Sequence, residues 1–396
     1  MISRRRFLVT ATSVATVAMA PRLGHAQKLA GTEVRIGALL PFGGPFADWG
    51  KKDRIAVEIA VEEINAAGGA GGVPLKVFIE DTGSKPPEAA ALTRKLALDQ
   101  RVLAIVGPFS SSEAEVAFLL GNQINVPMIA QASSKPGIGA ANRPWAFRMN
   151  VDEGRQAEPA VRFWVKQHNI KTAAVIHDVK DAVGQILGSR VLPAVAKKSG
   201  ITIVNEGSYV TFQTGDLDFS AQATRLKSLQ MDGLIFGGVF SDAASFLKEA
   251  RRQGLKQPLV GGNPLMNELF PEQAGPAGEG TVAPSFFWAG SPEPRVQKLV
   301  AAFAARAKPA GLPTTIEMIN VNTYEAVHML ADLMQKSGVT NRPEDLAADR
   351  ERIMKALTET RAWPGVMGRA GFNTDGDGVK DVYVFMVKNG KWVKVE

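Results

Sequence analysis

The sequence predicts an α/β protein with two doubly wound lobes, each built around a parallel sheet. Short apolar strands alternate regularly with amphipathic helices, and this alternation runs through two successive series. The roughly 370 residues that follow the N-terminal segment also exceed the size at which a single hydrophobic core keeps growing. We therefore expect one lobe for each series.

The N-terminal segment, residues 1–26, is predicted to be an export signal and not part of the fold. An arginine cluster at residues 4–6 precedes a weakly apolar run, and cleavage is expected near Ala26. The arginines followed by Phe7-Leu8 resemble a twin-arginine signal, and an ordinary secretory signal is the alternative. Either signal would carry the mature chain out of the cytoplasm, and we expect a periplasmic location.

Charge and composition exclude several classes of function. The formal net charge of +7 includes four arginines of the signal and falls to +3 for the mature chain. This small charge, without a run of Lys and Arg, argues against nucleic acid or a membrane surface as the partner. The chain has no cysteine, so disulfides and thiolate chemistry are excluded.

The first series opens with a predicted strand at residues 33–41 and a helix at 54–69 that ends in two glycines. The remaining elements expected in this series are a strand at 75–82, a helix at 86–100, a strand at 102–107, a helix after the serines at 110–112, and a strand at 126–133.

The second series starts at residue 172 and repeats the same alternation. Its expected elements are strands at 172–178, 201–210, 233–238 and 258–262, with helices at 183–199, 218–230 and 242–254. Near the C-terminus, residues 372–381 contain Asp and Gly at offsets similar to those of an EF-hand, but Val384 stands where the bidentate Glu should be. We interpret this run as a turn between two strands.

The sequence lacks the motifs of the common catalytic and metal sites. Its three histidines after the signal are isolated from one another, no P-loop or dinucleotide fingerprint is present, and no G-x-S-x-G precedes a helix. We therefore expect no cofactor and no metal. A serine hydrolase with Ser111 as nucleophile would need a base, and His177, in the other lobe, is the candidate near a strand end.

Polar and aromatic residues instead follow the strands, where open α/β sheets bind ligands. Ser110 and its two neighbours could cap a helix, or present hydroxyl and N–H groups to an anionic ligand. The candidate ligand-binding residues are Phe46, Trp49, Ser110, Ser111, Ala132, Ser133, Ser134, Val183, Phe240 and Asn263.

Several stretches in a fixed order resemble a known family. They include "VRIGALLPFGGPFADWG", "AVEEINAAGG", "AIVGPFSSS", "VPMIAQASS", "AFRMNVDEGRQ" and "LIFGGVFSDAASFLKEARRQGL". The chain resembles the type I periplasmic solute-binding proteins of ABC importers, within the leucine/isoleucine/valine-binding group. This resemblance implies two lobes that close on a small ligand, three crossover segments, and a membrane permease as the partner.

The resemblance also implies lobe boundaries and roles for residues. Lobe I would comprise residues 27–149 and 285–370, and lobe II residues 150–284 and 371–396. Ser111 matches a serine that binds the ligand carboxylate. Ala132 and Ser134 match the segment that holds the amino-acid head, and Trp49 matches an aromatic residue that packs on the ligand.

Three departures from the family pattern concern the ligand. Asn263 stands where the leucine-binding pattern has an acid that holds the α-ammonium, and Val183 and Val239 replace aromatic residues. The ligand is therefore expected to carry a carboxylate or amide without needing an α-ammonium. Asp181 or Asp242 could replace the missing acid. A ligand-sensing receptor module remains an alternative function.

Overall fold

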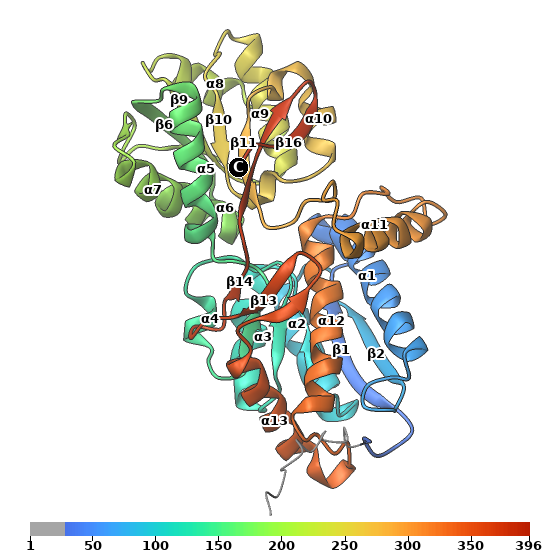
Figure 1. The fold of residues 1–396 in the computed structure, drawn as a ribbon. Helices are drawn as coiled ribbons and strands as arrows, with labels where there is room; N and C mark the ends of the chain where they lie inside the picture. Colours follow the sequence, from blue (N-terminus) through green and yellow to red (C-terminus); the bar gives the residue numbers. More distant parts are fainter. Residues whose placement is uncertain (1–27) are drawn as a thin grey trace, which may run out of the picture.

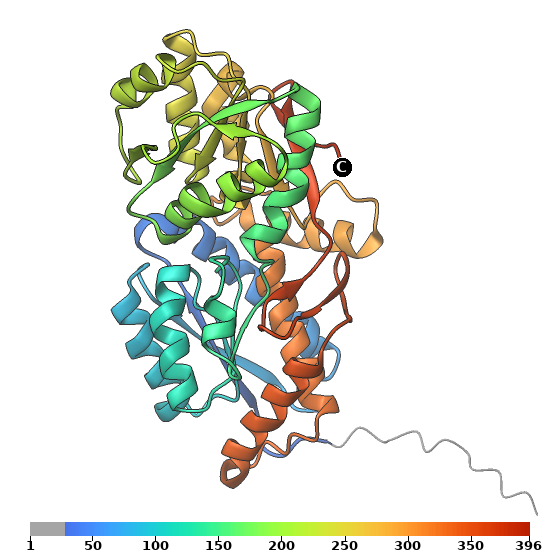
Figure 2. The ribbon, with the colours of Figure 1, turned by 90° about the vertical axis from the view of Figure 1, so that its left-hand side faces the viewer.

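The computed structural model describes residues 28–396, and the expected export signal lies outside them. The chain forms two α/β lobes stacked end to end, and the chain passes between them at three places (Figures 1 and 2). Each lobe has its own sheet, covered by helices on both faces. The predicted architecture of two doubly wound lobes is confirmed.

Lobe I contains a five-stranded sheet in which all strands are parallel. The strand order is β2-β1-β3-β4-β5, so the chain starts in the second position and winds outward in both directions. The strands are β1 (Val34–Leu40), β2 (Leu75–Asp81), β3 (Ile105–Val106), β4 (Met128–Ala130) and β5 (Ala146–Arg148).

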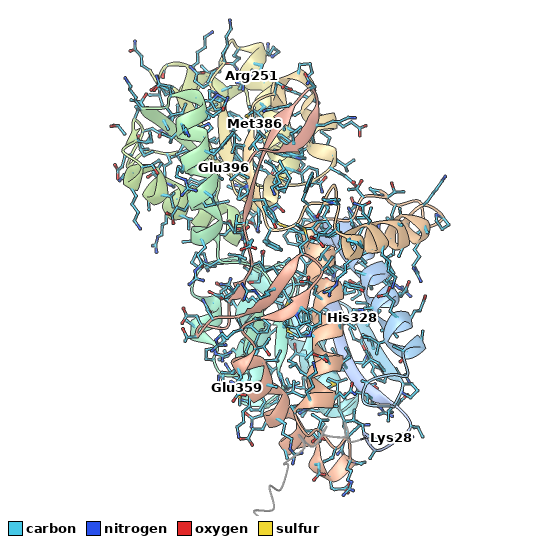
Figure 3. The ribbon with its side chains drawn as sticks, viewed as in Figure 1. Lys28, Arg251, His328, Glu359, Met386 and Glu396 are labelled. Atoms are coloured by element: carbon cyan, nitrogen blue, oxygen red, sulfur yellow. The ribbon has the colours of Figure 1, made fainter. Side chains whose placement is uncertain are left out.

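Helices cover both faces of this sheet. The long helices α1 and α12 pack against each other, and their apolar residues join those of the strands in one buried core. The elements outside the lobe I sheet are α1 (Ala47–Ala66), α2 (Pro86–Arg94), α3 (Ser111–Gln123), α4 (Ile138–Ala141), α11 (Pro294–Ala307), α12 (Met318–Lys336), α13 (Leu346–Glu359), β12 (Trp363–Gly365), β13 (Gly368–Phe372) and β14 (Gly378–Val379). Figure 3 places His328 on α12, within this lobe.

Lobe II contains an eight-stranded mixed sheet with the order β16-β15-β11-β10-β9-β6-β7, and β8 also pairs with β6. The C-terminal hairpin adds the antiparallel part, because β15 pairs antiparallel with β11 and with β16. The strands are β6 (Thr172–Asp178), β7 (Thr202–Ile203), β8 (Val210–Phe212), β9 (Gly233–Gly237), β10 (Leu259–Gly261), β11 (Val282–Ser285), β15 (Tyr383–Lys388) and β16 (Lys391–Lys394).

The helices of lobe II bury apolar faces against this sheet in two core clusters. They are α5 (Glu153–His168), α6 (Ala182–Ile186), α7 (Leu192–Lys198), α8 (Ser220–Lys227), α9 (Phe240–Arg252) and α10 (Leu269–Ala274). Across residues 28–396, no helix combines the length and the apolar character that crossing a bilayer requires.

The strand expected at residues 201–210 is divided into two short strands, β7 and β8. The side chain of Asn205 lies between them and bonds to β6 in place of a backbone partner. Its amide donates to the carbonyl oxygen of Val175 at 2.8 Å and accepts from the N–H of Val175 at 2.9 Å. This side chain satisfies both backbone groups, so the chain can turn here without leaving them unpaired.

The three passages between the lobes lie close together. The first spans residues 149–152, between β5 and α5, and the second begins at Phe286, after β11. Val151, Phe286 and Val382 belong to one apolar cluster, which holds the passages side by side.

The third passage differs from its expected position near Ala370-Gly371. Residues 371–379 remain with lobe I, and the chain crosses only between β14 and β15. Phe372 is fully buried in the lobe I core, where its ring centroid lies 5.1 Å from that of Phe147. Burial of this ring against β5 keeps the β13–β14 hairpin in lobe I.

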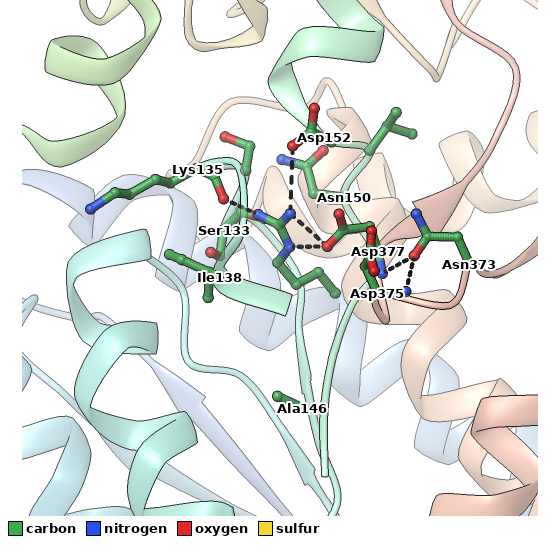
Figure 4. A network of polar contacts seen from close by, with 12 residues as sticks. Ser133, Lys135, Ile138, Ala146, Asn150, Asp152, Asn373, Asp375 and Asp377 are labelled. Carbon is green, nitrogen blue, oxygen red and sulfur yellow. Dashed lines mark hydrogen bonds and ion pairs between the residues drawn. The ribbon is translucent and has the colours of Figure 1, made fainter. Parts of the chain in front are cut away.

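The Asp/Gly run forms a turn, as predicted, but the turn joins β13 to β14, which lies within the run, and not to β15. It carries a buried ion pair (Figure 4). Nε and one terminal nitrogen of Arg148 donate to the same carboxylate oxygen of Asp377, at 2.8 and 2.6 Å. The other terminal nitrogen donates to the carbonyl oxygens of Lys135 at 2.7 Å and Ser133 at 3.4 Å. Arg148 is 0% exposed, so these partners replace its hydration.

We predict that Asp377→Ala lowers the free energy of unfolding by roughly 3–5 kcal/mol, because it removes the carboxylate that is hydrogen-bonded to the buried guanidinium and leaves only Asp152, at 3.9 Å, as a counter-charge. Urea unfolding monitored by circular dichroism measures this change. Asp375→Ala is the matched control, since Asp375 lies exposed in the same turn, and it should change stability by less than about 0.5 kcal/mol. Equal effects of the two substitutions would contradict the proposed importance of the pair.

Candidate ligand-binding site

Two adjacent cavities, which share part of their lining, lie between the lobes at the ends of strands from both sheets. The inner cavity has a volume of about 60 Å³ and the outer chamber about 630 Å³. Phe46, Trp49, Asp181 and Val239 line both of them. The volume of the outer chamber falls within the range of ordinary small-molecule sites, whereas the inner cavity alone is smaller.

Eight of the ten predicted residues line the inner cavity. They are Phe46, Trp49, Ser110, Ser111, Ala132, Ser134, Val183 and Asn263. Ser133 lies behind this surface, where its hydroxyl is 3.1 Å from that of Ser111. Phe240 lines the outer chamber instead.

Ser110 ends the loop after β3 and caps α3. Its hydroxyl accepts the N–H of Glu113 at 3.2 Å and donates to the Glu113 carboxylate at 2.6 Å. That carboxylate also accepts the N–H of Ser110 at 2.9 Å, which completes a capping box. The hydrogen of this hydroxyl is therefore already donated within the protein, and Ser110 serves the helix.

The hydroxyl of Ser111 is bonded differently. Its oxygen accepts the backbone N–H groups of Ser134 at 3.3 Å and Lys135 at 3.2 Å. A hydroxyl has two acceptor positions and one hydrogen, so both acceptor positions are used and Ser111 can act only as a donor. Its hydrogen points to the Ser133 hydroxyl at 3.1 Å, and a ligand oxygen would compete with Ser133 for it. Ser111 is also the first residue of α3, where helical N–H groups point outward without intrahelical acceptors. The inner cavity therefore has hydrogen-bond donors next to Ser111.

The loop at residues 131–135 is held from beneath as well as from Ser111. Arg148 binds the carbonyl oxygens of Ser133 and Lys135, and the side-chain amide of Asn150 donates to the carbonyl oxygen of Ala132 at 2.7 Å. Because these carbonyls point toward buried donors, the loop keeps one conformation against the cavity.

Aromatic rings form the wall that both lobes share. Phe46, Trp49 and Phe109 of lobe I lie with ring centroids 5.3–6.2 Å apart. Phe240 of lobe II meets the edge of Trp49 at 5.6 Å, with the rings nearly perpendicular at 87°. Contacts of this kind are favourable beyond the burial of apolar area, so the rings hold the lobes together here.

The lobe II side of the inner cavity carries an amide and a carboxyl. The side-chain amide of Asn263 donates to the Gln156 side chain at 2.9 Å and to Asn150 at 3.5 Å. Asp181 caps α6 by accepting the N–H of Gly184 at 2.7 Å. Burial raises the pKa of Asp181, as does repulsion from Asp178. Asp181 therefore brings a carboxyl to the inner cavity, although Asn263 occupies the position at which the family pattern has an acid.

An ion pair connects the lobes at the outer chamber. Lys52 on α1 is 3% exposed, and its ammonium lies 3.1 Å from Glu317 of lobe I and 3.4 Å from Glu268 of lobe II. Burial raises the pKa of Glu317, and the charge of Lys52 opposes this shift. The sequence analysis missed this group because a lysine on an amphipathic helix ordinarily faces solvent.

Glu153, which the sequence analysis also missed, lies buried beside the inner cavity. It is 0% exposed, and neither carboxylate oxygen has a hydrogen-bond partner within residues 28–396. Burial raises the pKa of Glu153 to about 8; the nearby Ser134 hydroxyl lowers it without reaching hydrogen-bond geometry. Its sequence signal is weak, because an acid in the first turn of a helix is common.

The serine-hydrolase alternative requires His177 to lie beside Ser111 as its base. The Nδ1 atom of His177 lies 2.9 Å from the carbonyl oxygen of Asp178, and the ring packs against Tyr209 in lobe II. His177 lines neither cavity. The structure therefore does not bring it to Ser111. Within the described residues, no cluster of His and acidic side chains is arranged to hold a metal ion.

We predict that Glu153→Gln flattens the pH dependence of stability. The folded protein keeps this carboxyl protonated up to about pH 8, while the unfolded chain releases the proton near its ordinary pKa of about 4.5. The contribution of Glu153 therefore makes stability fall between those pH values, by at most about 1.4 kcal/mol per unit.

The measurement compares urea unfolding of the wild-type protein and the variant at several pH values from about 5 to 8. The stability of Glu153→Gln relative to wild type should rise with pH. Glu158→Gln, on an exposed position of the same helix, is the matched control and should follow the wild-type curve. A constant difference between Glu153→Gln and wild type would refute the burial argument.

Comparisons with known proteins agree with this geometry. The chain is 28% identical over 370 residues to the Leu/Ile/Val-binding protein BraC3 of Rhizobium johnstonii, covering 93% of each chain. The structure of the leucine-binding protein LivK from Thermotoga maritima has a TM-score of 0.79 and 24% identity, covering 92% of this chain and 98% of that one.

A solute-binding protein of R. palustris in complex with benzoate has a TM-score of 0.77 and 21% identity, covering 92% of this chain and 95% of that one. These two structural similarities support the fold. A family model described as periplasmic binding protein matches residues 33–391, which is most of the chain. The chain therefore belongs to the periplasmic binding protein family.

Proposed function

We propose that this protein is the periplasmic solute-binding component of an ABC importer, and that it holds a small ligand by a carboxylate or amide oxygen between its two lobes. The observation that carries the proposal is the hydroxyl of Ser111 at the inner cavity, whose acceptor positions are filled by two backbone N–H groups, so that it can meet a ligand only as a donor. A ligand oxygen would replace the Ser133 hydroxyl, 3.1 Å away, as the acceptor of its hydrogen. The relative from Rhizobium johnstonii is named for binding Leu, Ile and Val, which supports a ligand of amino-acid size.

The acceptor group would lie in the inner cavity, close to Ser111 and the start of α3. A helix N-terminus carries partial positive charge, which favours an anion there. Ala132 and Ser134 would contact the same head group, since both line this cavity. Trp49 and Phe46 would pack against the body of the ligand, which extends into the outer chamber.

An α-ammonium is not required by this site. Asn263, at the place of the family's acid, is an amide that is already bonded to Gln156 and Asn150. A carboxylic acid without an amino group would leave no unpaired acid behind at this position. The benzoate complex of the protein from R. palustris shows that the fold accepts such a ligand.

We predict that Ser111→Ala weakens the binding of a carboxylate ligand about 10- to 100-fold, because a hydrogen bond to a charged group is worth roughly 1.5–3 kcal/mol. Calorimetry with leucine, benzoate and aliphatic carboxylates measures the change. Ser112→Ala is the control, since Ser112 lines only the outer chamber of the two cavities. Equal affinity of wild type and Ser111→Ala would contradict the assigned role.

A second measurement tests the expectation about the α-ammonium. Leucine and 4-methylpentanoate differ only by the amino group, and we predict that their affinities lie within about tenfold of each other. Thermal unfolding detects either ligand, because binding to the folded form raises the melting temperature. Tight binding of leucine without any response to 4-methylpentanoate would overturn this expectation and identify Asp181 as the ammonium partner to examine.

A further inference from the structure

The outer chamber carries an excess of negative charge. Its lining includes five acids and two lysines, Asp48, Asp181, Asp242, Glu268, Glu317, Lys52 and Lys180. Lys52 is already paired with Glu268 and Glu317. The ammonium of Lys180 lies on the exposed surface and forms no ion pair within residues 28–396. Of the acids contributed by lobe II, Glu268 is paired with Lys52, whereas Asp181 and Asp242 form no ion pair within residues 28–396.

Asp242 is the acid whose surroundings are least complete. It lies in the first turn of α9 and is 4% exposed. One carboxylate oxygen accepts the N–H of Gly215 at 3.2 Å, and the other is buried without a hydrogen-bond partner among the described residues. A buried acceptor without a partner is unfavourable, and more so when it is charged.

Other acids surround Asp242 and increase its need for a cation. Burial raises the pKa of Asp242 to about 6, the N–H of Gly215 opposes the shift, and Asp178, Asp216 and Asp181 raise it further by repulsion. Asp178 has partners of its own, since it accepts the N–H groups of Lys180 at 2.7 Å and Thr214 at 3.1 Å. The unmet acceptor is therefore at Asp242.

Aromatic rings line the same chamber. Phe46, Trp49 and Phe240 all border it, and Phe240 immediately follows Val239 at the start of α9, two residues before Asp242. A carboxylate next to several rings is typical of sites for organic cations, because ring faces attract positive charge and the low dielectric strengthens the ion pair. Metal ions would need more oxygen ligands than this arrangement supplies.

We propose that the outer chamber binds an organic cation, an ammonium or guanidinium group at the far end of the ligand, through Asp242 and the rings of Trp49 and Phe240. The inference rests on the proposed function, in which the inner cavity holds the acceptor head. The ligand is then a zwitterion whose cationic group is distant from its carboxylate, and not an α-amino acid with an apolar side chain.

The test uses pairs of probes that differ only in the cation. Calorimetry compares 4-aminobutanoate, 6-aminohexanoate and 8-aminooctanoate with butanoate, hexanoate and octanoate, because the distance between the two groups sets the best chain length. We expect one amino acid of the series to bind about tenfold or more tightly than its alkanoate. Asp242→Asn should abolish this preference while it preserves the acceptor for Gly215.

Asp216→Asn is the matched control, since it removes a neighbouring charge that does not line the chamber, and it should keep the preference. Alkanoates that bind as tightly as the amino acids, or a preference that persists in Asp242→Asn, would overturn the cation site and leave the proposed function standing. Hexylamine serves as a probe without a carboxylate.

If hexylamine binds through Asp242 while no carboxylate binds, the cation site is supported and the proposed carboxylate head is refuted. If neither the acids nor hexylamine bind, both proposals are refuted.

Discussion

The buried guanidinium of Arg148 is the group on which the geometry of the binding site depends. It joins β5, the carbonyls of the 131–135 loop and the β13–β14 turn, all within hydrogen-bond distance. A buried charge needs every one of these partners, so the loop, the turn and the strand are held in one arrangement. The first passage to lobe II begins one residue after Arg148, and the same network therefore fixes where the lobes start to separate.

The two lobes contribute different groups to the binding site. Lobe I supplies a donor surface, in which Ser110 completes the helix cap and Ser111, with both acceptor positions filled, can meet a ligand only as a donor. Lobe II supplies elements that face it, with Asn263 and Asp181 at the inner cavity and Phe240 and Asp242 at the outer chamber. The contact between Trp49 and Phe240 and the ion pairs of Lys52 close the boundary without filling the space between them, which leaves room for a ligand.

Several carboxyls around this boundary have a raised pKa, because their burial disfavours the charged form. Burial raises the pKa of Glu153 to about 8, of Asp53 to about 7 and of Asp242 to about 6. Asp53 is compensated by the side chains of Asn320 at 2.8 Å and Gln131 at 3.5 Å, whereas Glu153 and one oxygen of Asp242 are not. Buried acids with a raised pKa are common at functional sites, because a bound ligand can supply the hydrogen-bond donor or the positive charge that the protein does not provide.

The sequence by itself determined the alternation of strands and helices, the two lobes, and the strand ends at which eight of the ten expected residues meet. These features depend on local periodicity and on the loops that parallel strands must place at one edge of a sheet. Tertiary structure decided which lobe holds the β13–β14 hairpin, how Asn205 divides a strand, and that Glu153, Lys52 and Phe109 reach the boundary. Those outcomes depend on contacts between residues far apart in the chain, such as Phe372 with Phe147 and Asp377 with Arg148. The local sequence around a residue does not reveal such distant partners, because which groups are buried together is decided only when the whole chain folds.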